Sequence, residues 1–162
     1  MTAERIVWVN IGEVKTTSCG QTLKTNLGSC VGIGLLWRQR RLYGLAHCLL
    51  PAAPPQQTVK TAKYVDHAMA LLVEEMNITR SNTADLEAII CGGASIIKVQ
   101  SPTKHWTIGD DNVTAALQQL TKLHIPLMYR DVGDHYGRQM TLNGEEGTYF
   151  SQRIDANDCA ER

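Results

Sequence analysis

The stretch VGIGLLWRQRRLYGLAHCLL, Val31 to Leu50, dominates the expected fold because it predicts two buried strands joined by a tight basic turn. Val31 to Trp37 and Leu42 to Leu50 are apolar runs, and RQRR separates them, which is typical of an antiparallel hairpin. Side chains alternate along a strand, so one face of the second run carries Tyr43, Leu45, His47 and Leu49. His47 is thus expected on a mostly apolar face, with Cys48 pointing away from it.

Other segments supply further strands and two helices. Strands are predicted over residues 5–10, 86–99 with a break at Gly92 and Gly93, 125–132, and 139–154 as a hairpin. Apolar stripes with helical spacing cover residues 65–76 and 113–123, and Asp110 or Asp111 is expected to cap the second helix. Because strands and helices alternate irregularly, we predict an α+β fold: mixed β-sheets packed as a sandwich, with two main amphipathic helices on the outer face or faces.

Composition limits the partners and the compartment. The 162 residues, 43% of them hydrophobic, suit a single domain, expected over residues 1–154 with a loose tail over 155–162. Sixteen basic and sixteen acidic residues are interspersed, which argues against a nucleic-acid or membrane-surface partner. Glu4 and Arg5 interrupt the place where a signal peptide would be apolar, so a cytoplasmic protein without membrane insertion is predicted. Five irregularly spaced cysteines then favour reduced thiols.

Cys30 and His47 form the candidate reactive pair. Gly28 allows a tight turn before Cys30, and the N–H groups of Ser29 and Cys30 can point at one spot, as an oxyanion site requires. The hairpin brings His47 near Cys30 at its open end. Spacing alone favours a buried cysteine and a core histidine over a catalytic pair. No C-x-x-C or H-x-x-x-H pair supports zinc, so no metal or other cofactor is predicted.

A series of motifs favours the catalytic interpretation of Cys30 and His47: LGSCVGIGLLW, GLAHCLLP, KYVDHAMALLVEEM, CGGASII, IGDDN and DVGDHYGR. In this order and spacing the chain strongly resembles CheD, the family of chemoreceptor glutamine deamidases of bacterial chemotaxis. The resemblance spans about residues 6–154 and implies a cysteine-hydrolase-like fold with Cys30 as nucleophile and His47 as base. Methyl-accepting chemotaxis receptors would be the protein substrate, and a CheC-type phosphatase a further partner.

The third catalytic residue of that family is a threonine six positions before the cysteine, where this chain has Lys24. Thr25 lies one residue later and Thr22 two residues earlier. We select Thr25 as the third catalytic residue, and the alternatives that stay open are Thr22, Lys24 itself, or no third residue. Asp134 is a second departure, since it stands where the family usually has a glycine.

The resemblance implies a protein-glutamine glutaminase that forms a Cys30 thioester and releases ammonia. Receptor methyl-ester hydrolysis would follow the same route. Two alternatives stay open. One is a non-catalytic adaptation module that binds receptors or a CheC-type phosphatase, and Lys24 in place of the threonine supports it. The other is a cysteine hydrolase that acts on a small amide.

Overall fold

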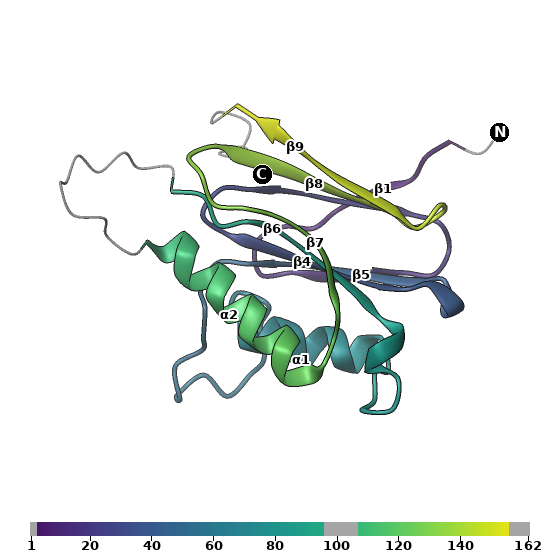
Figure 1. The fold of residues 1–162 in the computed structure, drawn as a ribbon, viewed down its shortest axis with the longest axis horizontal. Helices are drawn as coiled ribbons and strands as arrows, with labels where there is room; N and C mark the ends of the chain where they lie inside the picture. Colours follow the sequence, from purple (N-terminus) through teal and green to yellow (C-terminus); the bar gives the residue numbers. More distant parts are fainter. Residues whose placement is uncertain (1–2, 96–106, 156–162) are drawn as a thin grey trace.

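A computed structural model describes residues 3–95 and 107–155 of the chain, and in it two β-sheets and two helices form three layers (Figure 1). The helices are α1 (Val65–Glu75) and α2 (Ile108–Leu123). The strands are β1 (Ile6–Trp8), β2 (Val14–Thr17), β3 (Thr22–Leu27), β4 (Val31–Trp37), β5 (Leu42–Cys48), β6 (Glu87–Gly92), β7 (Leu127–Val132), β8 (Gly137–Asn143) and β9 (Thr148–Ile154).

Both sheets are mixed. One has the order β1-β3-β8-β9, with β1 parallel to β3, and the other has the order β2-β5-β4-β6-β7, with β6 parallel to β7. A parallel pair needs a long crossover, and α2 lies within the one that joins β6 to β7. Both helices cover the outer face of the five-stranded sheet, and the four-stranded sheet covers its other face (Figure 1).

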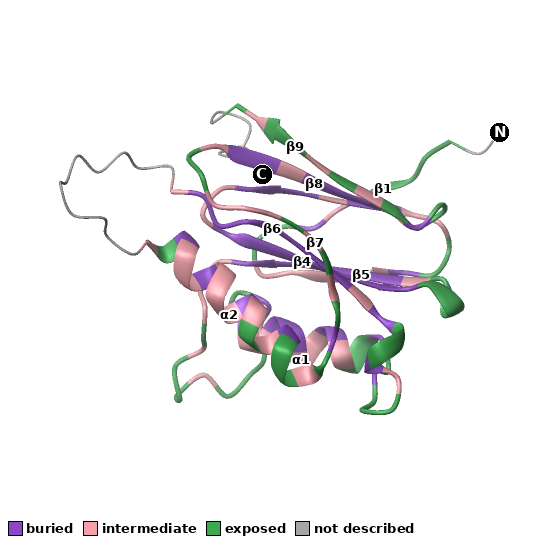
Figure 2. Cartoon of the chain, in the orientation of Figure 1, coloured by how far each residue is buried: buried purple, intermediate pink, exposed green. Residues whose placement is uncertain are grey.

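Strand β4 lies at the centre and is buried along its whole length (Figure 2). Its odd-numbered residues face the helices, where Val31, Ile33 and Leu35 join the apolar faces of α1 and α2. Its even-numbered positions face the second sheet, and two of them are glycines. A Cβ added at Gly32 would lie 2.7 Å from the sulfur of Met140, so the missing side chain is what allows the two sheets to pack closely here.

The predicted fold class is therefore confirmed, and so are the 31–50 hairpin, both helices, strand β7 and the C-terminal hairpin. The helix cap was assigned wrongly. Thr107 is the N-cap of α2, and it forms a capping box with Asp110, the third residue of the helix. The Thr107 hydroxyl accepts from the Asp110 N–H, and the Asp110 carboxylate accepts from the Thr107 N–H. Strands β2 and β3 were missed. The expected strand over 86–99 ends at Gly92, and residues 96–99, like the 156–162 tail, lie outside the described residues.

Candidate active site

Cys30 ends the three-residue connection between β3 and β4, and three successive carbonyls fix this connection. The Gly28 carbonyl accepts from Ala94 N at 3.0 Å and the Cys30 carbonyl accepts from Gly93 N at 2.8 Å. Between them, the Ser29 carbonyl accepts from Nδ2 of Asn112 at 3.0 Å. The Cys30 connection is thus held by the two residues that follow β6 and by α2, both far along the chain.

Two glycines after β6 make this close approach possible. Gly92 has φ of +107°, and a Cβ there would lie 2.2 Å from the Cys30 carbonyl oxygen. Gly93 has φ of +67°, and a Cβ there would meet the Gly109 carbonyl of α2 at 2.9 Å. L-residues disfavour such dihedrals and the space is already filled, so the CGGA motif provides backbone contact with the Cys30 connection.

His47 lies near the end of β5 on the face toward the second sheet, as the alternation predicted. Leu45 and Leu49 belong to the same inter-sheet cluster as Cys30, whereas Cys48 faces the helices. The register pairs Val31 with Cys48, which makes Cys30 and His47 diagonal neighbours across the hairpin. The β1–β2 turn fixes the backbone of His47: Gly12 N donates to its carbonyl at 2.9 Å, and its N–H donates to Glu13 O at 3.1 Å.

Thr25 contacts the imidazole ring of His47 directly. Its Oγ1 lies 2.7 Å from His47 Nδ1 and donates to Val9 O at 2.6 Å. A hydroxyl has one hydrogen, and turning it toward Nδ1 would leave two oxygens facing each other at hydrogen-bond distance. Nδ1 therefore carries the imidazole hydrogen and donates to Thr25, and the lone pair is on Nε2. Within the described residues, Nε2 is buried and has no hydrogen-bond partner.

The strand period separates Thr25 from the other two candidates. Leu23, Thr25 and Leu27 face the inter-sheet core, and Thr22 and Lys24 lie on the opposite face of β3. Thr22 is bonded there to Glu4, at 2.9 Å from Oγ1 to Oε1. Only Thr25 of these three lies at the His47 ring.

Burial sets the charge state of His47 and the accessibility of each group. Desolvation lowers the pKa of His47 to about 4, although the Val9 carbonyl and the charge of Glu13 act in the other direction. The imidazole is thus neutral at physiological pH. All three residues are buried: Cys30 is 6% exposed, His47 2% and Thr25 0%. A neutral imidazole near a buried thiol suits proton abstraction from that thiol.

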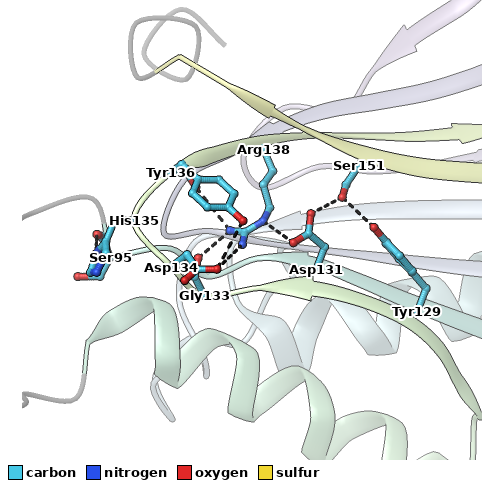
Figure 3. A network of polar contacts seen from close by, with 9 residues as sticks. All are labelled: Ser95, Tyr129, Asp131, Gly133, Asp134, His135, Tyr136, Arg138 and Ser151. Carbon is cyan, nitrogen blue, oxygen red and sulfur yellow. Dashed lines mark hydrogen bonds and ion pairs between the residues drawn. The ribbon is translucent and has the colours of Figure 1, made fainter.

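The loop over residues 133–136, part of which is drawn in Figure 3, is hydrogen-bonded to residues 92–95, the segment whose N–H groups hold the Cys30 connection. Gly133 N donates to Gly92 O at 3.0 Å, and Ser95 N donates to the Asp134 carbonyl at 2.9 Å. Asp134 has φ of +55°, a conformation that aspartate tolerates better than most residues, which explains how it can occupy a glycine position. Its carboxylate adds a second negative charge 3.9 Å from the buried Arg138.

Val9 and Asn112 could not be assigned to this site from the sequence. Val9 contributes a carbonyl from an unremarkable strand end, and Asn112 lies in a motif that looked like a helix cap. In the described ranges, no group of three His, Cys, Asp or Glu side chains could hold a metal ion. None of the helices in the described part of the chain is long and apolar enough to cross a bilayer.

Comparison with known proteins gives consistent matches. Residues 49–153 match the family model described as CheD chemotactic sensory transduction. The chain is 35% identical to a probable chemoreceptor glutamine deamidase CheD of Bdellovibrio bacteriovorus, over 90% of this chain and 93% of the relative. It is 42% identical to a probable chemoreceptor glutamine deamidase CheD 3 of Geobacter sulfurreducens, over 88% and 90%. Among solved structures, YlmD of Geobacillus stearothermophilus aligns with a TM-score of 0.46 and 17% identity, covering 75% of this chain and 51% of its own.

Proposed function

Because the chain belongs to the CheD family, we propose that it deamidates selected glutamines of chemotaxis receptors, with Cys30, His47 and Thr25 as its catalytic residues. The observation that carries the proposal is the contact between Thr25 Oγ1 and His47 Nδ1, at 2.7 Å. It directs the lone pair of Nε2 away from Thr25, which is the arrangement that a base needs in order to receive a thiol proton.

The first half of the reaction is acyl transfer to sulfur. His47 Nε2 takes the Cys30 proton as Sγ attacks the side-chain amide carbon of glutamine. The N–H groups of Ser29 and Cys30 stabilise the oxyanion. Among the described residues, the Ser29 N–H donates to no backbone carbonyl, which leaves it available for this role. The imidazolium then protonates the leaving nitrogen. Ammonia departs and a thioester remains.

The second half is hydrolysis of that thioester. Neutral His47 takes a proton from water, the resulting hydroxide attacks the thioester carbon, and the proton returns to sulfur as the C–S bond breaks. Glutamate and the thiol are the products. A neutral amide thus becomes a carboxylate on the receptor, which alters its local electrostatics. A receptor methyl ester would be hydrolysed by the same steps.

The non-catalytic alternative drew its support from Lys24, and that support weakens because Thr25 lies at the His47 ring and Lys24 on the opposite face of β3. We also propose, from the family resemblance, that the reaction takes place in the cytoplasm and that a CheC-type phosphatase binds this protein.

The test is conversion of glutamine to glutamate in a purified cytoplasmic fragment of a chemoreceptor, read by the mass increase of about 1 Da per site. We expect conversion by the wild type and none by Cys30→Ala. Cys48→Ala is the matched control, since Cys48 is a buried thiol on the other face of the same hairpin. No conversion by the wild type, or equal conversion by Cys30→Ala, would overturn the proposal.

A further inference from the structure

We infer that Asn112 is a positioning residue for the proposed reaction, and that it sets the orientation of the peptide group between Ser29 and Cys30. The inference rests on the proposed function. Asn112 is in the second turn of α2 and is 0% exposed, and its two side-chain hydrogen bonds go to the backbone carbonyls of Ser29 and Leu49. Its effect therefore has to pass through the backbone.

The amide of Asn112 joins the two segments that carry the proposed nucleophile and base. One Nδ2 hydrogen goes to Ser29 O and the other to Leu49 O, each at 3.0 Å. Ser29 precedes Cys30 directly, and Leu49 follows His47 by two residues on the same chain segment. A single rigid NH₂ group therefore fixes the distance between the start of β4 and the end of β5, on which the distance from thiol to imidazole depends.

The peptide plane passes this constraint to the reacting groups. Peptide groups are planar, and no described residue has a cis bond, so the Cys30 N–H points opposite to the Ser29 carbonyl. Holding that carbonyl on the α2 side aims the Cys30 N–H away from α2. The Gly28 and Cys30 carbonyls are held by backbone donors of residues 93 and 94, whereas the Ser29 carbonyl depends on this one side chain.

The unfavourable free energy of burying an unpaired polar atom of Asn112 argues against a purely packing role. Oδ1 of Asn112 is buried and has no hydrogen-bond partner within the described part of the chain. A buried acceptor without a partner is unfavourable, and an apolar residue of the same size would avoid it. The two bonds to Ser29 O and Leu49 O are what the amide supplies and leucine cannot.

The experiment compares Asn112→Leu, which fills the same space without donors, with Asn112→Ala, which only removes atoms and covers the case in which leucine is not accommodated. Leu120→Ala is the control, because it truncates a buried residue of the same helix and leaves the amide in place. For both Asn112 variants we expect kcat for receptor deamidation to fall by about tenfold to a hundredfold with KM little changed, the cost of a misplacement of about 1 Å. Leu120→Ala should lose stability and keep kcat.

A second readout does not need the deamidase reaction. The rate of Cys30 alkylation by iodoacetamide, followed at the Cys30 peptide against pH, reports the setting of the thiol. We expect a changed rate or a shifted profile in the Asn112 variants and the wild-type profile in Leu120→Ala. If the wild type deamidates nothing, the proposed function fails while this measurement still decides the role of Asn112. Wild-type alkylation profiles in folded Asn112→Leu or Asn112→Ala would overturn the inference, as would a wild-type kcat in either variant.

Discussion

At the scale of single residues, the Thr25 hydroxyl determines which nitrogen of His47 carries the hydrogen and which carries the lone pair. Its hydrogen is committed to Val9 O, at 2.6 Å, so it can only accept from Nδ1. Thr25 could be proposed from the sequence because it lies next to Lys24, the position at which the family has its catalytic threonine. The choice between Thr22, Lys24 and Thr25 could not be made without knowing that residues 22–27 form a strand, because only the strand period separates their faces.

Thr25→Val keeps the shape of the side chain and removes the acceptor. The imidazole can then flip or change tautomer, and we expect kcat for receptor deamidation to fall by roughly tenfold to a hundredfold. Thr25→Ser, which retains the hydroxyl, should keep most of the activity, and Lys24→Ala should keep nearly all of it. Steady-state kinetics on one receptor fragment makes the comparison. Equal activity of Thr25→Val and Thr25→Ser would contradict this role.

Burial of neutral His47 also makes stability depend on pH. Its pKa falls from 6.5 to about 4 on folding, so between these values the unfolded chain binds more protons than the folded one. Stability should therefore fall as the pH drops from 6.5 toward 4, by about 3 kcal/mol from this residue. Urea unfolding at a series of pH values should show a shallower decline for His47→Gln than for the wild type. Parallel curves for His47→Gln and the wild type would refute the effect.

At the scale of elements, the parts that could be predicted are those whose burial shows in the sequence. Strand β4 is apolar throughout because both its faces are covered, and α1 and α2 have clear stripes because one face of each is buried. Strands β2 and β3 were missed because VKTT and TLKTNL are rich in threonine and lysine, which mark no single buried face. They are strands because β5 and β8 pair with them across long sequence separations.

The contact between the end of β6 and the Cys30 connection can be tested with a matched pair of glycines. Both Gly92 and Gly133 have positive φ, but an added Cβ would lie 2.2 Å from the Cys30 carbonyl at Gly92 and would meet nothing within 4 Å at Gly133. Gly133→Ala should cost only the backbone strain, about 1 to 2 kcal/mol, and leave deamidation nearly unchanged. Gly92→Ala should cost clearly more in urea unfolding and reduce kcat, since the Cys30 connection must move. Similar losses in the two variants would contradict this account.

At the scale of the whole molecule, the two sheets are joined along one side by polar contacts between β7, β8 and β9 (Figure 3). Arg138 on β8 is 1% exposed and its Nε lies 3.0 Å from Asp131 Oδ1 on β7. The Ser151 hydroxyl on β9 donates to the other oxygen of Asp131 and lies 3.0 Å from the Tyr129 hydroxyl. Strands β7, β8 and β9 are thus linked through one buried cation and its carboxylate. The same Arg138 donates to Gly133 O at 2.7 Å, and Gly133 N in turn donates to Gly92 O in the segment that holds Cys30.

Arg138 is 1% exposed and Asp131 is 29% exposed, so removing the Asp131 charge leaves a buried cation whose remaining carboxylate, Asp134, is 66% exposed and 3.9 Å away. Asp131→Asn should therefore lower the free energy of unfolding, by up to about 3 kcal/mol because Asp131 is only partly buried. Asp134→Asn changes the same chemistry at a carboxylate that is 66% exposed and 3.9 Å from Arg138, and it should cost less than about 1 kcal/mol. Replacing both partners, Asp131→Leu with Arg138→Met, should recover much of the loss, because no unpaired charge then remains. Urea unfolding of the four proteins measures these differences. Equal losses for Asp131→Asn and Asp134→Asn would show that Arg138 does not depend on Asp131, and the joint between the sheets would then have to be apolar.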